Sequence, residues 1–228
     1  MSVAENIGRI RRELGEGSLP KLVAVSKTFQ APAILEAYRA GQRDFGENYV
    51  QEAIAKIREL KSTCPDIVWH FIGPLQSNKT RIVAEHFDWV QSVDRLKIAQ
   101  RLSEQRPEGM PDLNLLIEVN VDASPTKSGV TPEALPEVMK AVAALSRVRL
   151  RGLMAIPDPA PEIELAAKFA RLHALFLEAQ SQGFDIDTLS MGMSADYRIA
   201  IQEGATMVRI GSAIFGARDY SSKGKEGR

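Results

Sequence analysis

A lysine at the end of an apolar segment is the residue best placed for covalent chemistry. Lys27 follows "LVAVS" (22–26), and the Leu, Val and Ala residues of that segment predict a strand buried on both faces. A lysine with its ordinary pKa of about 10.4 is protonated at neutral pH, but burial lowers that pKa and the neutral amine can then condense with an aldehyde. The alternative is a lysine whose stem packs on the protein while its ammonium reaches water.

Two glycine- and serine-containing segments near the end of the sequence indicate an anion site. "LSMGMSADYRIAI" places Ser194 directly before a predicted helix, where it would act as the N-cap and leave backbone N–H groups for an anion. "VRIGSAIFG" places Gly211 and Ser212 at the end of another apolar segment. The alternative is that Ser194 only caps its helix and that the glycines only permit tight turns.

Two polar residues inside apolar segments need partners. An unpaired Arg209 within "MVRIGSAIF" would be costly, so we expect its partner to be a carboxylate or the ring nitrogen of a ligand. A histidine in an apolar segment, such as His70 in "VWHFIG", is more often a core residue with its hydrogen bonds made than an acid or base. No second His or Cys stands at metal-ligand spacing, so we expect no metal site. The single cysteine, Cys64, is interpreted as structural or incidental.

Composition excludes several function classes. The 228 residues include 29 basic and 29 acidic side chains, so there is no net charge to attract nucleic acid or an anionic membrane. The apolar stretches are far shorter than the roughly 18 residues of a membrane span. "MSVAENIGRIRREL" predicts an amphipathic helix rather than a signal peptide, so we expect a cytoplasmic protein.

Strands and helices alternate along the whole chain. The sequence predicts strands at 22–25, 43–48, 66–73, 87–94, 113–122, 148–156, 188–193 and 206–216, separated by helices. This order predicts a single α/β domain over 1–228, a (β/α)8 barrel with an extra N-terminal helix. An open doubly wound sheet is the alternative, but "SKTFQAP" lacks the glycines usual after its first strand. The polar tail, from about 219 to 228, is expected to fray.

In such a barrel, ligands bind at the carboxyl ends of the strands. The residues predicted there are Lys27, Glu47, Asn48, His70, Gly73, Ser92, Asp94, Asn120, Met154, Ser190, Ser194 and 209–212. A buried lysine beside a glycine- and serine-rich end indicates a carbonyl compound that carries a phosphate.

Several ordered motifs extend this interpretation. "LVAVSKTF", "FGENYVQE", "WHFIGPLQSNK", "SVDR", "EVNVDASPTKSG", "GLMAI" and "LSMGMSADYRIAIQEGATMVRIGSAIFG" together resemble the pyridoxal phosphate homeostasis proteins, the YggS/PROSC family, nearly from end to end. The family is similar to the N-terminal barrel of the alanine racemases. The resemblance implies the cofactor pyridoxal 5'-phosphate (PLP), held as a Schiff base on Lys27.

The resemblance also assigns the remaining site residues. It implies that Ser194, Gly211 and Ser212 grip the phosphate and that Arg209 faces the pyridine nitrogen. Asn48, His70, Asn120 and Met154 are expected to line the pocket around the ring. Lys79 and Lys127 receive no firm role. Because arginine keeps its proton, the ring nitrogen would stay unprotonated and the ring would be a poor electron sink.

The expected function is PLP binding without robust catalysis, so no residue is assigned as catalytic. The racemases that the family resembles have a second domain that supplies a catalytic tyrosine, and we expect no room for it after the eighth strand. The resemblance implies a carrier in vitamin B6 and amino- and keto-acid balance, with apo PLP-dependent enzymes as partners, and we expect a monomer. A PLP-dependent amino-acid racemase is the first alternative. A barrel enzyme that uses Lys27 on its own sugar-phosphate substrate is the second.

Overall fold

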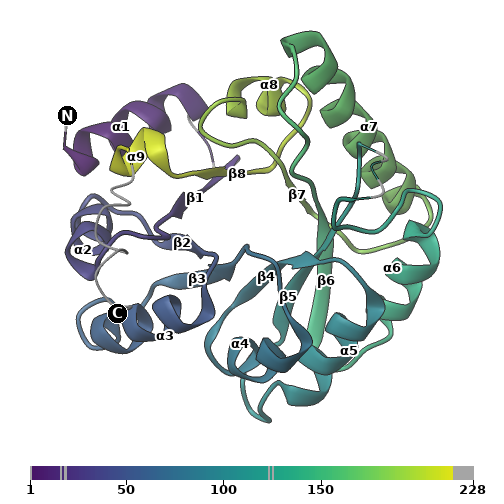
Figure 1. Ribbon diagram of the computed structural model, residues 1–228, viewed down its shortest axis with the longest axis horizontal. Coiled ribbons are helices and arrows are strands. Elements are labelled where there is room, and N and C mark those ends of the chain that lie inside the picture. The colour runs from purple at the N-terminus through teal and green to yellow at the C-terminus, as the bar shows by residue number, and fades with distance from the viewer. Residues whose placement is uncertain (1, 16, 18–19, 123, 125, 218–228) are drawn as a thin grey trace, which may run out of the picture.

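Eight parallel strands form a closed barrel within the residues that the computed structural model describes, 2–15, 17, 20–122, 124 and 126–217 (Figure 1). The strands are β1 Lys21–Val25, β2 Asp44–Glu47, β3 Val68–Phe71, β4 Trp89–Val93, β5 Leu113–Glu118, β6 Val148–Met154, β7 Thr188–Ser190 and β8 Met207–Ile210. Strand β8 pairs with β1, with Ile210 opposite Ala24, and this closure confirms the barrel and excludes the open sheet. The tail expected to fray, 219–228, lies outside the described residues.

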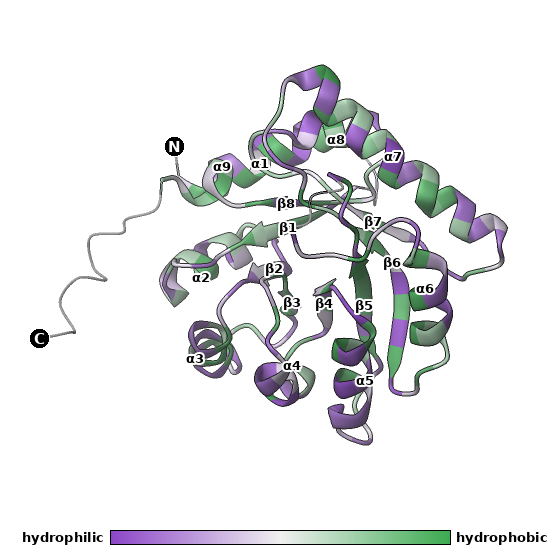
Figure 2. Cartoon of the chain, turned by 45° about the vertical axis from the view of Figure 1, so that its right-hand side comes forward, coloured by the Kyte–Doolittle hydropathy of each residue, from purple (hydrophilic) through white to green (hydrophobic). Residues whose placement is uncertain are grey.

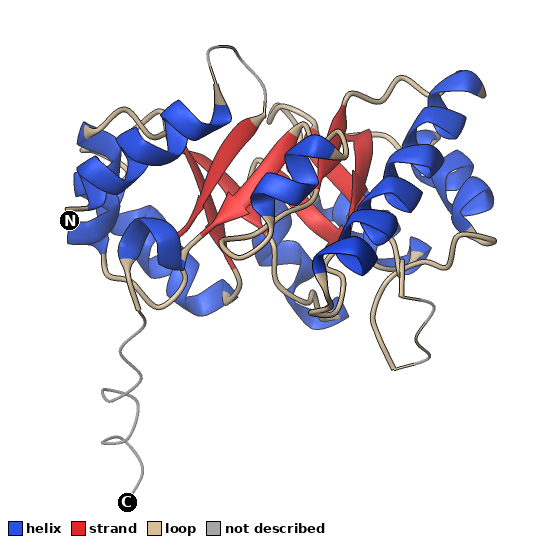
Figure 3. Ribbon diagram, turned by 90° about the horizontal axis from the view of Figure 1, so that it is seen from above, coloured by secondary structure: helices blue, strands red, loops and turns tan. Residues whose placement is uncertain are grey.

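Helices surround the ring of strands (Figure 3). They are α1 Val3–Leu14, α2 Ala31–Arg39, α3 Val50–Leu60, the 3₁₀ turn η1 Ser77–Lys79, α4 Thr80–His86, α5 Leu96–Gln105, α6 Leu135–Ala143, α7 Glu162–Ser181, α8 Tyr197–Gln202 and α9 Ser212–Phe215. The strands are mainly apolar, and most helices combine apolar with polar residues (Figure 2), as expected for helices that cover a sheet. None of the described helices is both long and apolar enough to cross a membrane.

Alternate side chains of each strand belong to two different cores, one between the strands and the helices and one inside the barrel. In β1, Leu22 and Ala24 belong to the large core that packs against the helices, whereas Val23 belongs to a smaller cluster with Trp89, Leu116, Met154 and Met207. Successive strand residues point to opposite faces, so this smaller cluster fills the barrel interior. Residues two positions further along each strand therefore point inward one layer nearer the carboxyl ends.

The expected N-terminal helix is present and packs beside α9 (Figure 1). The Asn6 side-chain amide donates to the Ile214 carbonyl at 2.8 Å. Arg198 pairs with Glu13 at 2.7 Å, and the Tyr197 hydroxyl donates to the same carboxylate. Helix α1 thus supports the two short helices, α8 and α9, that follow the last two strands.

Strand β1 begins one residue earlier than the sequence predicts, whereas the other seven strands are shorter than predicted, and the largest difference is at β8. The predicted strand 206–216 ends at Ile210, and "SAIF" forms α9 instead. A short apolar segment fits a strand or a helix equally well by pattern alone. The backbone N–H groups of Gly211 and Ala213 donate to Ser194 Oγ rather than to a neighbouring strand, so the ladder stops.

Candidate functional site

A cavity of about 250 Å³ lies at the carboxyl ends of the strands. Its lining consists of Val25, Lys27, Asn48, Ile72, Ile156, Met193, Ser194, Ala195, Arg209, Gly211 and Ser212. Six of the predicted site residues therefore meet here, namely Lys27, Asn48, Ser194, Arg209, Gly211 and Ser212. They come from segments far apart in the sequence, after β1, β2 and β7 and from the end of β8, which the closed barrel brings together.

Three other predicted residues, His70, Asn120 and Met154, are not part of this lining. His70 and Met154 are fully buried and point into the barrel, but one layer too deep. The residues two positions later, Ile72 and Ile156, line the cavity in their place. Asn120 follows β5 and bonds instead to the Ser124 backbone, with its amide 2.7 Å from the Ser124 carbonyl.

Arg209 is only 3% exposed and has neutral hydrogen-bond partners. Its guanidinium donates to Ser190 Oγ at 2.6 Å and to the Ala155 carbonyl at 2.9 Å. Burial lowers the pKa of Arg209 to about 10, while the carboxylates of Glu118 and Asp196 act in the opposite direction. Arg209 therefore stays charged at neutral pH and in a fixed orientation, and no carboxylate of the described residues is hydrogen-bonded to it.

The sequence predicts Ser194 as the N-cap of the helix that follows, but the N-cap of α8 is Asp196. Ser194 Oγ accepts hydrogen bonds from Gly211 N at 3.2 Å and Ala213 N at 3.3 Å. A hydroxyl has two acceptor positions and one donor, so these bonds leave the O–H available to donate. Glycine is required at 192, where φ is +92° and an added Cβ would lie 2.6 Å from Ala200 Cβ.

A hydrogen-bonded chain of buried side chains connects Arg209 to His70 through the barrel interior. Ser190 Oγ donates to Gln91 Oε1 at 2.7 Å, and Gln91 Nε2 lies 3.0 Å from His70 Nδ1. The other imidazole nitrogen lies 3.0 Å from Asp44 Oδ1. If Gln91 donates to Nδ1, the imidazole is neutral and donates to Asp44 through Nε2. A path of hydrogen bonds through Gln91, Ser190 and Arg209 thus joins His70 to the cavity.

The pH dependence of stability tests the neutral state of His70. Burial lowers its pKa below the ordinary 6.5, against the raising effect of Asp44. Below about pH 6.5 the unfolded chain gains a proton that folded His70 does not, so stability falls as the pH drops toward the folded pKa. We therefore expect the unfolding free energy to fall less between pH 7 and 5 in His70→Gln than in the wild type. Urea unfolding of the wild type, of His70→Gln and of the control His86→Gln at several pH values measures the unfolding free energy. An equal dependence of that free energy on pH in all three proteins would contradict the prediction.

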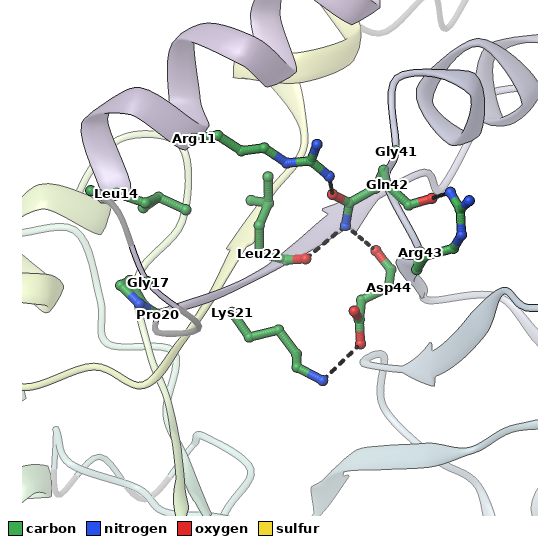
Figure 4. A pocket seen from close by; sticks show the side chains of 11 residues that line it. Arg11, Leu14, Gly17, Pro20, Lys21, Leu22, Gly41, Gln42, Arg43 and Asp44 are labelled. Carbon is green, nitrogen blue, oxygen red and sulfur yellow. Dashed lines mark hydrogen bonds and ion pairs between the residues drawn. The ribbon is translucent and has the colours of Figure 1, made fainter.

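A larger cavity, of about 420 Å³, lies at the opposite end of the barrel (Figure 4). Its charged groups are already paired, since Lys21 Nζ lies 3.4 Å from Asp44 and Arg11 donates to Gln42 Oε1 at 3.1 Å. The Gln42 amide in turn bonds to the Leu22 and Asp44 carbonyls. Because barrels of this kind bind ligands at the carboxyl ends of the strands, the smaller cavity is the candidate site.

Beside Lys27 lies a buried charged cluster that sequence reasoning did not find in full. It comprises Glu47, which the sequence places at a strand end, together with Glu52 and Lys56 of α3. Lys56 is 4% exposed and falls on the buried face of its helix with Ala53 and Leu60. That helical spacing is the signal that identifies it.

Among the described residues, no group of three or more His, Cys, Asp or Glu side chains is arranged to hold a metal ion.

The chain matches known proteins over nearly its whole length. Residues 1–219 match the family model for the alanine racemase N-terminal domain. The pyridoxal phosphate homeostasis protein of Pseudomonas aeruginosa is 54% identical, over 97% of this chain and 98% of its own. The protein of the same name from Escherichia coli K12 is 52% identical, over 97% of this chain and 99% of its own.

Solved structures show the same relationship. PipY of Synechococcus elongatus PCC7942, determined with PLP bound, is 43% identical with a TM-score of 0.86, over 94% of this chain and all of its own. Alanine racemase from Corynebacterium glutamicum is 16% identical with a TM-score of 0.73, over 96% of this chain and 61% of its own. At that identity the likeness to the racemase is one of fold.

Proposed function

Because this chain belongs to the family of pyridoxal phosphate homeostasis proteins and carries the alanine racemase N-terminal domain, we propose that it binds PLP reversibly in the cavity at the carboxyl ends of its strands. The observation that carries the proposal is the convergence of Lys27, Arg209 and the Ser194–Gly211 pair on one cavity of about 250 Å³. The PLP-bound structure of PipY, a relative that matches this chain over its whole length, supports it.

The residues around the cavity fit this cofactor chemically. PLP carries an aldehyde, a phosphate and a ring with polar substituents, so its site must offer an amine, anion donors and further polar groups. The cavity offers the Lys27 amine, the Ser194 and Ser212 hydroxyls and the Arg209 guanidinium. Asn48 Oδ1 is buried and has no hydrogen-bond partner among the described residues, so it can accept a bond from a ligand donor.

Each residue has a distinct task in this proposal. Lys27 would hold PLP through its amine, which can condense with the aldehyde with loss of water in a linkage that hydrolysis reverses. The Ser194 hydroxyl, whose acceptor positions are engaged by Gly211 and Ala213, donates to the phosphate. The Arg209 guanidinium would face the pyridine ring of PLP. When bound, PLP supplies a reactive carbonyl and an electron-withdrawing ring.

We propose that the protein buffers PLP and passes it on, with weak catalysis or none. The names of the relatives that match along their whole length support a homeostatic role. If Arg209 faces the ring nitrogen, as we propose, it would leave that nitrogen unprotonated, and we therefore expect weak catalysis. Amino-acid racemase is the alternative, and a turnover assay separates the two. The expected cytoplasmic location, monomeric state and transfer to apo-enzymes stay predictions.

The absorbance spectrum tests the proposal directly. We expect the purified wild type, supplied with PLP, to show a visible absorption band, and borohydride reduction to leave the reduced cofactor on the Lys27 peptide. Lys27→Ala should lose both, because no amine remains to form the bond, while Lys61→Ala should retain both. A wild type that takes up no PLP would refute the proposal. Racemisation of an added amino acid by the loaded wild type would favour the alternative.

A further inference from the structure

The two peptide groups that flank Lys27 are both held by the same buried cluster. The carbonyl of Ser26 accepts a hydrogen bond from Lys56 Nζ at 2.9 Å. On the other side of Lys27, the N–H of Thr28 donates to Glu52 Oε1 at 2.5 Å. The orientation of these two peptide planes sets both backbone torsions of the residue between them. The cluster therefore helps to set the direction in which the Lys27 side chain leaves the backbone, together with the Phe29 N–H, which donates to the Ser26 carbonyl at 3.0 Å.

The members of the cluster are tightly connected. Lys56 Nζ lies 2.6 Å from Glu52 Oε1 and 2.8 Å from Glu47 Oε1, and Glu47 Oε1 also accepts from Ser26 Oγ at 2.6 Å. Burial raises the pKa of Glu47, and Lys56 counteracts that rise. Removing charges from water offsets much of what an ion pair gains, so a buried pair is weak evidence for stability alone. A positioning role accounts better for a charged cluster at this place.

Thr28 shows what the cluster holds in place. Its φ is +72°, in the left-handed region that a β-branched residue rarely occupies. Such a conformation persists only when its surroundings impose it, and the bond to Glu52 supplies that constraint. The strained residue is the immediate neighbour of Lys27, so release of Thr28 would change the backbone next to the reactive amine.

We propose that Lys56, Glu52 and Glu47 are positioning residues that hold the backbone of Lys27 in the conformation in which its amine meets the aldehyde carbon. This inference rests on the proposed function, which it extends to side chains outside the cavity lining. A displacement of about 1 Å can slow a reaction 100-fold, so a loosened Lys27 is expected to react at least about 10-fold more slowly with PLP.

Two variants and two matched controls test the proposal. Lys56→Met and Glu52→Ala remove members of the cluster, and Lys61→Met and Glu59→Ala remove exposed charges at the end of the same helix. The first readout is hydrogen exchange at the Thr28 amide without PLP. We expect exchange at least about 10-fold faster in both cluster variants and unchanged in both controls. The second readout is the rate at which the visible band forms after PLP is added. We expect this rate to be at least about 10-fold lower in both cluster variants and unchanged in both controls.

A double variant separates positioning from general loss of structure. Glycine adopts a left-handed φ without strain, so Thr28→Gly should make the Glu52 constraint less necessary. The slowing caused by Glu52→Ala is therefore expected to be smaller in the Thr28→Gly background than in the wild type. An equal slowing in both backgrounds would overturn the positioning role.

The outcomes remain distinguishable from those of the proposed function. If the wild type takes up no PLP, the proposed function fails, but exchange at Thr28 still reports whether the cluster holds the backbone. If the wild type loads PLP and both folded cluster variants load it at the same rate, the inference is overturned. Should Lys56→Met not fold, Glu52→Ala decides, because the Glu52 side chain is 25% exposed and its removal leaves the Lys56–Glu47 pair.

Discussion

A Gly152→Ala variant is expected to lose much of its folding stability. Gly152 lies in β6 opposite Thr188 of β7, with φ at +149°, and an added Cβ would stand 1.8 Å from the Thr188 carbonyl oxygen. The neighbour is backbone, so it cannot give way without separating the two strands. Overpacking and an unfavourable backbone conformation each cost about 1–3 kcal/mol, against a typical total stability of about 5–15 kcal/mol.

Thermal unfolding measures this effect. A loss of about 4 kcal/mol lowers the Tm of a chain of this size by roughly 8–16 °C. The matched control is Gly109→Ala, because Gly109 also has a positive φ, +81°, but an added Cβ there would meet nothing within 4 Å. We expect Gly109→Ala to lose only about 1–2 kcal/mol. If the two variants unfolded at the same temperature, the close approach of β6 and β7 would not be what requires glycine at 152.

An Arg209→Met variant is expected to bind PLP about 10- to 100-fold more weakly. A hydrogen bond to a charged group contributes about 1.5–3 kcal/mol, and the substitution removes the cavity's buried guanidinium. Arg209→Lys should recover little of the affinity. A single ammonium cannot reproduce the planar fork that donates to Ser190 Oγ and the Ala155 carbonyl together.

Titration of each variant with PLP, followed by the visible band, measures the affinity. With a pKa of about 10, Arg209 keeps its proton below about pH 9, so its own titration should not change wild-type affinity between pH 6 and 8.5. Arg149→Met is the control, because Arg149 pairs with Asp185 on the surface. Full affinity in Arg209→Lys would mean that charge alone suffices at this position.

The architecture and the principal site residues follow from local sequence features. The alternation of apolar strands with amphipathic helices indicates the barrel. The apolar pattern of each segment predicts a strand or a helix, and the order of these elements predicts parallel strands connected by helices. Lys27, Gly211 and Ser212 occupy the ends of apolar segments, and all three line the cavity. Because this fold binds ligands where its strands end, sequence position alone is enough to bring these residues to one site.

Depth within the barrel does not follow from the sequence. His70 and Met154 have the same inward parity as Ile72 and Ile156, but only the latter pair lines the cavity. The strand ends decide which layer faces the ligand, and a pattern of apolar residues locates those ends poorly. The N-cap role predicted for Ser194 is wrong for a related reason, since the partners of its hydroxyl, Gly211 and Ala213, follow a different strand.

The sequence alone therefore determines which elements form, which reactive side chains they carry and at which end of the barrel those side chains lie. The tertiary structure decides how the side chains are held. The bonds of Lys56 and Glu52 to the peptides around Lys27, and the chain from Arg209 to His70, join residues from separate elements. Such contacts depend on how strands and helices pack against one another. Spacing along the chain can show which face of an element is buried, as it does for Lys56, but not which atoms of another element that face meets.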